Sequence, residues 1–517
     1  MRKSSRLYLL ILGIWVALIA VTSLPLLVEI QRSNDYGWGV FSLVLVSTLF
    51  ICYFWLNGTK DVVYTLYYYL FKKSLIKLPP KGYYKSVHGN EKEPYVLLVY
   101  CACDDFSAES LTASMQQNYG KYDVVILDDS KKESEKAAIM EFARENHIYV
   151  MRRKDREGFK AGNLNNFLGR ANYDYFVILD SDEIIPPDFT QRCLDYFAYF
   201  KDTGIVQANH IATRNRNKFM DLFAIGVNSH WLTYQATKHH HGFLSLLGHG
   251  AMVSRECYDA VGGFPHLVAE DLCFSIEARN RGYFVAFAPD IICEEEYPIN
   301  YLAFKKRHNK WTQGNMEFIK KYTPKVFGSK MRWFEKLDII LFTYNLPLTA
   351  FFSFYIIINV VALPLMGYNI TYPVWMLIPT AVFLIAPLLN DMIFYGGKLK
   401  MRQLIWYIGH SVLLYGSMFF VSLKASTKSI FNKSVFLVTP KTHRKISVRE
   451  AFSANKAEIL FAVAVLAIAT MCSRSPLPTL LIAIPALSSV YLTLISNRAD
   501  KQRLAPERVR TRLSKVR

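Results

Sequence analysis

Long apolar stretches on both sides of a polar middle region limit what this chain can fold into. Residues 7–30 and 38–56 are apolar, a polar region then runs to about residue 335, and further apolar stretches follow. A helix needs about 20 apolar residues to cross roughly 30 Å of hydrocarbon. We therefore expect a membrane protein in which a polar domain is inserted between two sets of transmembrane helices.

The later apolar stretches are residues 339–365, 373–395, 404–423, 459–471 and 477–495. Lys and Arg favour the cytosolic side of a membrane, and both residues 424–449 and the tail after Arg498 are rich in them. Both can be cytosolic only if one of the five stretches does not cross. Residues 404–423 are the weakest candidate, because His410 and Ser417 interrupt them, and we expect an amphipathic helix in the interface there. The prediction is six transmembrane helices in the plasma (inner) membrane, with the inserted domain and both termini cytosolic.

The composition of the 517-residue chain supports two environments. Hydrophobic residues make up 52% of the chain, and the formal net charge is +19. Because many basic residues flank apolar segments, we expect contact with membrane lipid and no binding of nucleic acid. The eight cysteines have neither metal-ligand spacing nor a paired framework, so free thiols are expected.

Between residues 94 and 325, short apolar runs alternate with polar helical stretches. The clearest runs are 95–100, 124–127, 176–179 and 205–207. Strands that alternate with helices indicate an α/β domain with a mainly parallel sheet. In such sheets, ligands bind at the carboxyl ends of the strands.

Acidic clusters follow three of these apolar runs. A single acidic residue at a strand end usually belongs to a turn, but three clusters on one sheet would meet at one edge, where a cation is needed to offset their charge. The Asp-Ser-Asp arrangement suits Mg²⁺ or Mn²⁺, with the remaining ligand positions filled by water and by phosphate oxygens of a nucleotide sugar. The clusters are Asp104 and Asp105, Asp128 and Asp129, and Asp180 and Asp182, of which Asp180 and Asp182 are the expected metal ligands.

Lys160 lies in Gly-Phe-Lys-Ala-Gly-Asn-Leu-Asn, where a helix could begin. A helix amino terminus with nearby glycine and donors such as Asn163 suits a phosphate group. The alternative is a solvated lysine within a basic surface run.

A second group of candidates lies between residues 239 and 271. Asp271 is the expected general base, beside Glu270, although an Asp near a helix start is more often a cap. His249 is a candidate contact to the sugar, with a structural role as the alternative. The histidine run 239–241 could bind a metal, but we expect a solvated loop.

The polar region closes with Arg307, Lys310 and Trp311. Trp311 could offer an aromatic face to a sugar ring, and the two cations could meet a diphosphate. The alternative is anchoring at the membrane interface, where Trp beside Lys and Arg is common.

The order of these motifs resembles that of the processive family 2 membrane glycosyltransferases, which include cellulose, curdlan, chitin and hyaluronan synthases. In that family a GT-A domain carries an Asp-Asp site for the nucleoside, Lys-Ala-Gly-x-Leu-Asn, Asp-x-Asp for metal and diphosphate, Glu-Asp with the base, and QxxRW at the acceptor entrance. The matching positions are Asp128 and Asp129, residues 160–165, residues 180–182, Glu270 and Asp271, and residues 307–311. The resemblance covers roughly residues 94–445.

Residues 436–441 also resemble the FxVTxK gating loop of the cellulose synthase branch, which closes over bound nucleotide. The matching residues are Phe436, Val438, Thr439 and Lys441. Three positions depart from the family: Ala269 replaces the Thr before Glu-Asp, Arg307 replaces Gln, and Lys310 replaces Arg. Lysine keeps the charge of arginine but loses its bidentate fork.

The resemblance implies an order of segments along the chain. Two transmembrane helices (1–60) and an interfacial linker (61–93) precede the cytosolic GT-A domain (94–325). The expected remainder is two transmembrane helices with an interfacial helix (326–423), the gating segment (424–445), two transmembrane helices (446–497) and a basic cytosolic tail (498–517).

The resemblance also implies an inverting, metal-dependent transferase that polymerises a UDP-sugar, with UDP-glucose preferred, into a β-linked polysaccharide. The enzyme would also move the polysaccharide across the membrane, with export or accessory proteins as possible partners. His249, Glu270 and Trp311 are expected at the acceptor. Two alternatives stay open: transfer of a single sugar to a lipid carrier, and an inactive export component. Donor binding is expected from Asp104, Asp105, Asp128, Asp129, Lys160, Asn163, Asp180, Arg307 and Lys310.

Overall fold

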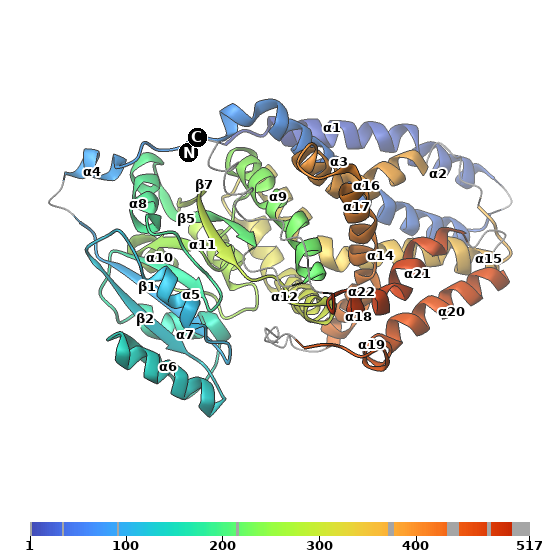
Figure 1. Cartoon of the computed structure of the whole chain (residues 1–517). Coiled ribbons are helices and arrows are strands. Elements are labelled where there is room, and N and C mark those ends of the chain that lie inside the picture. The colour runs from blue at the N-terminus through green and yellow to red at the C-terminus, as the bar shows by residue number, and fades with distance from the viewer. Residues whose placement is uncertain are drawn as a thin grey trace.

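The computed structural model describes residues 3–33, 36–89, 93–212, 217–370, 377–431, 444–472 and 477–498. Figure 1 shows two parts, an α/β domain that contains the strands and a bundle of long helices beside it. The inserted domain expected from the sequence is therefore present.

The α/β domain is built on a seven-stranded sheet in the order β3-β2-β1-β4-β6-β5-β7. β6 runs antiparallel to β4 and β5, and the other pairs are parallel, so the prediction of a mainly parallel sheet is confirmed. The four apolar runs became β1, β2, β4 and β5, whereas the sequence pattern missed the other three. The strands are β1 Val96–Ala102, β2 Tyr122–Asp128, β3 Tyr149–Arg152, β4 Tyr175–Asp180, β5 Thr203–Ala212, β6 Ala251–Ser254 and β7 Phe284–Glu295.

Helices cover both faces of the sheet, which explains why the central strands are apolar throughout. In β1, Leu97 and Val99 face one hydrophobic layer, and Val96, Leu98 and Tyr100 face the other. The first layer includes α7, α9, α10 and α11, and the second includes α5, α6 and α8. The helices of the domain are α5 Ala108–Ser114, α6 Glu133–Glu145, α7 Phe159–Leu168, α8 Phe189–Tyr199, α9 Lys218–His241, α10 Arg255–Val261, α11 Glu270–Asn280 and α12 Tyr301–Gly328.

The register of β1 brings the acidic clusters to one edge. Ala102 pairs with Asp128 of β2, and Cys101 pairs with Asp180 of β4. Asp104 and Asp105 follow the end of β1 directly. The convergence expected from three strand ends is therefore real.

The bundle contains several helices long and apolar enough to cross a membrane, as expected of a membrane-bound protein. Within the described residues these stretches are Arg6–Arg32, Trp38–Leu75, Asn345–Leu365, Ile378–Tyr395, Met401–Phe431 and Leu477–Ile495, and the pair Val448–Ala454 with Lys456–Cys472, bent by 65°, would add a seventh. The helices outside the α/β domain are α1 Arg6–Val21, α2 Ser23–Arg32, α3 Trp38–Leu75, α4 Tyr83–His88, α13 Trp333–Thr343, α14 Asn345–Ile357, α15 Leu363–Leu365, α16 Leu377–Tyr395, α17 Met401–Gly416, α18 Met418–Phe431, α19 Val448–Ala454, α20 Lys456–Cys472, α21 Leu480–Leu487 and α22 Ser489–Ile495.

The expected interfacial helix corresponds to α17 and the start of α18. Residues Met401–Phe431 together satisfy the length and composition of a span. In Figure 1, however, α17 runs across the direction of α1, and it packs against α9 and α21. Its place in the interface, the count of six spans and the segment boundaries stay predictions.

The apolar stretch expected at residues 339–365 is divided in the structure. α13 is a separate helix that ends at Thr343, and the span begins at Asn345. Asp338 of α13 accepts a hydrogen bond from the backbone N–H of Phe243 at 2.7 Å. α13 therefore belongs to the junction with the α/β domain.

Lys3, the first residue that the structure describes, is buried in this junction. The Lys3 Nζ donates to the carbonyl of Gly242 at 2.7 Å and lies 3.8 Å from Glu335 of α13. Glu335 also pairs with Arg279 of α11 at 3.0 Å. Lys3, the α/β domain and α13 are thus joined by one buried ion-pair cluster.

The expectation of a solvated loop at residues 239–241 is wrong. These histidines form the last turn of α9, where His239 is 3% exposed and His240 donates to the carbonyl of Leu75 at 2.8 Å. The long α9 packs against α3 and α16, so its end is covered by the bundle.

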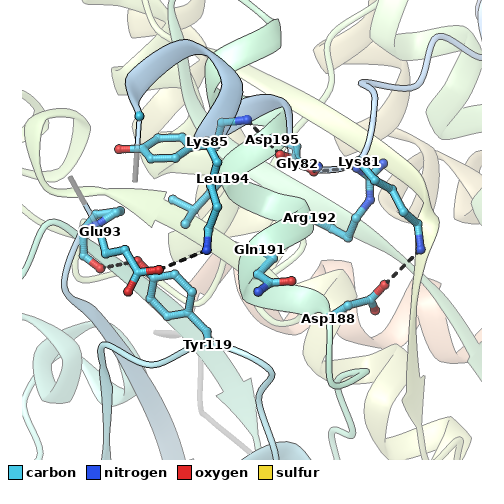
Figure 2. A pocket seen from close by; sticks show the side chains of 13 residues that line it. Lys81, Gly82, Lys85, Glu93, Tyr119, Asp188, Gln191, Arg192, Leu194 and Asp195 are labelled. Atoms are coloured by element: carbon cyan, nitrogen blue, oxygen red, sulfur yellow. Dashed lines mark hydrogen bonds and ion pairs between the residues drawn. The ribbon is translucent and has the colours of Figure 1, made fainter. Parts of the chain in front are cut away.

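A hollow of about 200 Å³ lies between α4 and α8 (Figure 2). Asp195 accepts hydrogen bonds from the backbone N–H groups of Gly82 and Tyr84 at 3.0 and 2.9 Å, and Lys81 lies 3.8 Å from Asp188. None of the candidate site residues that the structure describes lines it. These contacts attach the linker after α3 to the back of the domain.

Candidate active site

Lys160 connects three separate parts of the domain. α7 begins at Phe159, after Gly158 with φ 71°, so Lys160 lies in its first turn. Its Nζ donates to the carbonyl of Gly248 at 2.8 Å and forms an ion pair with Asp180. Burial lowers the pKa of Lys160, but the charge of Asp180 more than offsets this, and the pKa lies above its usual value. Because 41% of the Asp180 side chain is exposed, this pair is open to a ligand.

The Asp-Ser-Asp segment is held by its neighbours on both sides. Ser181 donates through Oγ to Asp105 at 2.7 Å, and Asp182 accepts from the backbone N–H of Glu296 at 3.1 Å. Asp105 therefore lies beside the segment, as predicted. Asp180 is the last residue of β4 and Asp182 follows two residues later, while their role as ligands of a divalent cation stays a prediction.

Other acidic residues at this edge of the sheet already accept hydrogen bonds from the protein. Asp104, at φ 60°, accepts from the backbone N–H groups of Lys131 and Lys132 at 2.6 and 2.8 Å. Asp128 pairs with Arg152 at 2.5 Å. The structure thus brings Asp104 and Asp128 to the predicted edge, while their contact with a nucleoside stays a prediction.

Asp129 forms a bidentate pair with Arg153, at 2.9 and 2.7 Å. Arg153 also donates to the carbonyls of Glu157 and Phe159, both at 2.6 Å. Only 6% of the Arg153 side chain is exposed, so it fixes the loop that leads to Lys160. The backbone of this loop is tightly packed against α7, since a Cβ on Gly162 would lie 1.9 Å from the carbonyl oxygen of Glu157.

Asp271 and Glu270 lie in the first turn of α11. A Cβ on Gly248 would lie 3.3 Å from Asp271 Oδ2, so this carboxylate faces the loop whose carbonyl holds Lys160. Burial raises the pKa of Asp271. Burial and the charge of Asp271 raise the pKa of Glu270 to about 7, despite the opposing charge of Lys160. Two partly buried acids with raised pKa values therefore lie beside the Lys160–Asp180 pair.

Arg307, Lys310 and Trp311 lie on α12, which also faces this site. Burial lowers the pKa of Lys310, against the charges of Glu270 and Asp180, so Lys310 lies near these acids, and its contact with a diphosphate stays a prediction. The Arg307 guanidinium lies 4.3 Å from the centroid of the Trp311 ring, which is 40% exposed. Arg307 thus covers one face of Trp311.

His249 belongs to a buried charge network that the sequence pattern missed. It donates through Nδ1 to Glu183, while its Nε2 lies 3.5 Å from Glu295. Glu183 also contacts His210 at 2.9 Å. Burial opposes the charged form of His249, but Glu183 and Glu295 raise its pKa to about 10. Burial likewise opposes ionised Glu183, but His249 and His210 lower its pKa to about 2.

Glu183, His210 and Cys293 form a group that could hold a metal ion, since their ligand atoms lie within 4.8 Å of one another. This group differs from the predicted pair Asp180 and Asp182. It is buried, and the protonated His249 already supplies the charge that Glu183 requires.

The sequence profile of the glycosyl transferase family group 2 matches residues 175–393, which include the Asp-Ser-Asp segment, His249 and Asp271. This chain carries a family 2 glycosyltransferase domain. The resemblance drawn from the motifs is therefore confirmed, and so is a GT-A-like fold around a mostly parallel sheet.

The curated proteins that match this chain include plant glucomannan mannosyltransferases and a bacterial polysaccharide synthase. A probable glucomannan 4-beta-mannosyltransferase of Arabidopsis thaliana is 23% identical over 329 residues, which cover 59% of this chain and 58% of that protein. A poly-beta-1,6-N-acetyl-D-glucosamine synthase of Staphylococcus aureus is 23% identical over 320 residues, 59% of this chain and 73% of that protein. The match to a further plant relative, from Oryza sativa, covers 53% of its length, so the chain spans little more than half of these plant proteins.

Solved structures also resemble the family 2 domain. A mannosyltransferase from Pyrobaculum calidifontis, in complex with GDP-Man and Mn²⁺, is 18% identical with a TM-score of 0.44, covering 75% of this chain and 99% of that chain. Staphylococcus aureus TarS in complex with UDP-GlcNAc is 12% identical with a TM-score of 0.34, covering 59% of this chain and 92% of that one.

The sequence prediction missed three residues of the buried charge network around His249, although the position of each in the sequence is a signal. Glu183 directly follows Asp182, His210 interrupts the apolar β5, and Glu295 ends β7. The predicted Asn163 is 2% exposed in α7, and its Oδ1 has no hydrogen-bond partner in the described part of the chain. The predicted gating residues lie outside the described residues: Phe436, Val438, Thr439 and Lys441.

Proposed function

We propose that this chain is an inverting, metal-dependent, processive glycosyltransferase. It joins sugars from a nucleotide sugar, preferably UDP-glucose, into a β-linked polysaccharide and passes the polymer across the membrane. The observation that carries the proposal is the meeting of Lys160, Asp180 and Asp271 around the backbone of Gly248. A cation, an exposed carboxylate and a partly buried base thus lie around one loop. The names of the polysaccharide-forming relatives support the same reaction class.

The donor end of this site suits a diphosphate. Asp180 and Asp182 offer carboxylate oxygens two residues apart, which is a ligand set for Mg²⁺ or Mn²⁺. A bound cation would offset the negative charge of the departing diphosphate. Lys160 contributes positive charge at the same place, and its helix-start position directs backbone N–H groups toward phosphate oxygens.

The acceptor end suits proton removal. Asp271 takes the proton of an acceptor hydroxyl, and the resulting oxygen attacks the anomeric carbon opposite the leaving group. The new carbon–oxygen bond forms as the bond to the diphosphate breaks, and the nucleoside diphosphate leaves with that electron pair. Attack from the opposite face converts an α-linked donor into a β-linkage.

The membrane arrangement belongs to the same proposal. The family 2 domain lies on the cytosolic side of the plasma (inner) membrane, where nucleotide sugars are made, and α17 lies in the interface. The long apolar helices and the basic flanks of the bundle support this placement. Export or accessory proteins would act on the polymer on the far side.

The test uses the full chain in lipid nanodiscs with Mn²⁺ and a panel of UDP-glucose, UDP-GlcNAc and GDP-mannose. We expect release of nucleoside diphosphate with one donor and formation of a β-linked polymer. Asp271→Asn should abolish transfer while leaving nucleotide affinity unchanged, because the base is lost and the donor end remains. Full turnover by this variant would overturn the assignment of the base.

A single-sugar transferase is the second candidate, because Arg307 covers one face of Trp311 and so reduces the ring available to a polymer. Product length separates the two: a ladder of long products supports polymerisation, and one added sugar supports single transfer. An export component without activity would release no diphosphate from any donor.

A further inference from the structure

We propose that His249 and Glu295 form a subsite that binds one ring hydroxyl of the acceptor sugar, and that Glu183 and His210 are positioning residues behind it. This subsite rests on the proposed glycosyl transfer and specifies how the acceptor is recognised. The argument begins with how deeply the four side chains are buried.

Burial in the network increases away from the reaction site. The side chains of Glu183 and His210 are 0% exposed, whereas those of His249 and Glu295 are 13% and 8% exposed. The outer pair is therefore the part that a ligand can reach. The inner pair has no such access and acts only through its contacts.

The outer pair has a gap that fits a hydroxyl group. Because Glu183 accepts from Nδ1, His249 presents Nε2 to Glu295, and these atoms are 3.5 Å apart. That separation exceeds a normal N–H···O hydrogen bond, but one oxygen can lie about 2.8 Å from both atoms. A hydroxyl both accepts from Nε2–H and donates to a carboxylate, so it satisfies the two groups at once. A carboxylate ligand could not donate to Glu295, and an ammonium could not accept from His249.

The loop that carries His249 is fixed from behind. Gln207 donates to the carbonyl of His249 at 3.0 Å and accepts from the N–H of Leu247 at 2.8 Å. A Cβ on Gly250 would lie 2.3 Å from His210 Nε2, so the backbone is packed directly against the inner pair. The ring of His210 in turn lies 4.4 Å from that of Trp231. This packing keeps Nε2 in place before a ligand arrives.

The position along the chain assigns the subsite to the acceptor. The residue before His249 is Gly248, which approaches Asp271 on one side and holds Lys160 through its carbonyl on the other. A sugar bound at His249 therefore lies beside the base. The hydroxyl that it binds is a neighbour of the one that Asp271 deprotonates.

Two substitutions of His249 test the roles of its two ring nitrogens separately. His249→Asn places an amide near the Nδ1 position and keeps a donor for Glu183, but it removes the group at Nε2. His249→Gln places an amide near the Nε2 position and should restore part of the function. His147→Asn is the matched control, because His147 is exposed and at φ 54°, which Asn tolerates.

The experiment measures both binding and turnover with the full chain in nanodiscs. Cellotetraose and its mono-deoxy derivatives at the non-reducing end are titrated calorimetrically, without donor and with UDP. For the wild type, one deoxy derivative should bind and react on the order of 10²-fold less well, because the buried pair then loses its partner. His249→Asn should lose a similar factor with the parent sugar and discriminate no further against that derivative, while the KM for the donor stays unchanged.

Three results would overturn the subsite. These are wild-type affinity and discrimination in His249→Asn, no recovery in His249→Gln relative to His249→Asn, and a loss that follows deoxy donors instead of deoxy acceptors. Because calorimetry reports acceptor binding without transfer, the subsite is tested even if no donor is turned over. An absence of turnover with every donor would contradict the proposed function and not the subsite.

Discussion

Replacing Gly162 with Ala should disable the donor site through the backbone, without touching a catalytic group. The added Cβ would lie 1.9 Å from the carbonyl oxygen of Glu157, where contacts under 3.0 Å are essentially never found. The oxygen must therefore move by about 1 Å. It accepts a hydrogen bond from Arg153, which also holds Asp129, so the movement passes into that pair.

The size of the effect follows from this displacement. Forcing an extra carbon into a packed region costs about 1–3 kcal/mol of folding free energy. Lys160 lies two residues before Gly162 on the same helix turn, and a shift of about 1 Å in a positioned group can lower a rate by about 10²-fold. We expect kcat/KM for the donor to fall by roughly that factor.

The assay is diphosphate release at a series of donor concentrations, with thermal unfolding measured in parallel. Gly120→Ala is the control, because among the described residues its Cβ would meet Glu93 Oε2 alone, at 3.9 Å. The reasoning is refuted if Gly162→Ala keeps wild-type kcat/KM and nucleotide affinity. It is also refuted if Gly120→Ala loses as much activity.

Three further outcomes are expected. Activity should fall as the pH is lowered, and the fall should begin at a higher pH than for an enzyme whose base is an ordinary Asp. The reason is that burial raises the pKa of Asp271 and that of Glu270, the latter to about 7. A pH profile of kcat/KM that stays flat to about pH 5 would contradict this. Glu335→Gln should lower the free energy of unfolding by about 3–5 kcal/mol, since a buried pair loses its carboxylate, whereas Glu133→Gln, at an 85% exposed side chain, should change little in the same urea titration. Chelation by EDTA should stop transfer and added Mn²⁺ restore it, with Asp182→Asn needing more Mn²⁺; activity that persists in EDTA would exclude the metal requirement.

The sheet and its acidic edge could be predicted because both depend on local sequence. A run such as Val-Val-Ile-Leu followed by Asp128 and Asp129 identifies a buried strand and its carboxyl end, whatever surrounds it. Parallel pairing then requires neighbouring ends to meet. The predicted position of Lys160 at a helix start was correct for the same reason.

The partners of these residues could not be predicted, because they depend on contacts between distant segments. Glu183 and His249 are 66 residues apart, and their pairing follows from the placement of β6 between β4 and β5. The antiparallel β6 has only four residues, too few for a clear alternating pattern. The histidines at the end of α9 appeared solvated in the sequence because the helices that cover them belong to the bundle.

The buried cluster that joins Lys3 to Glu335 has a consequence for how the protein is made. During synthesis, the carboxylate that pairs with Lys3 is added more than 300 positions later, and the seven-stranded sheet emerges between the two residues. Until then, Lys3 and Arg279 lack the carboxylate that joins them. A fragment that stops at residue 325, the predicted end of the domain, would lack Glu335 and would lose the part of the cover of α9 that α16 provides. We therefore expect the isolated α/β domain, cut at its apparent boundary, to expose surfaces that the bundle covers in the full chain and to aggregate.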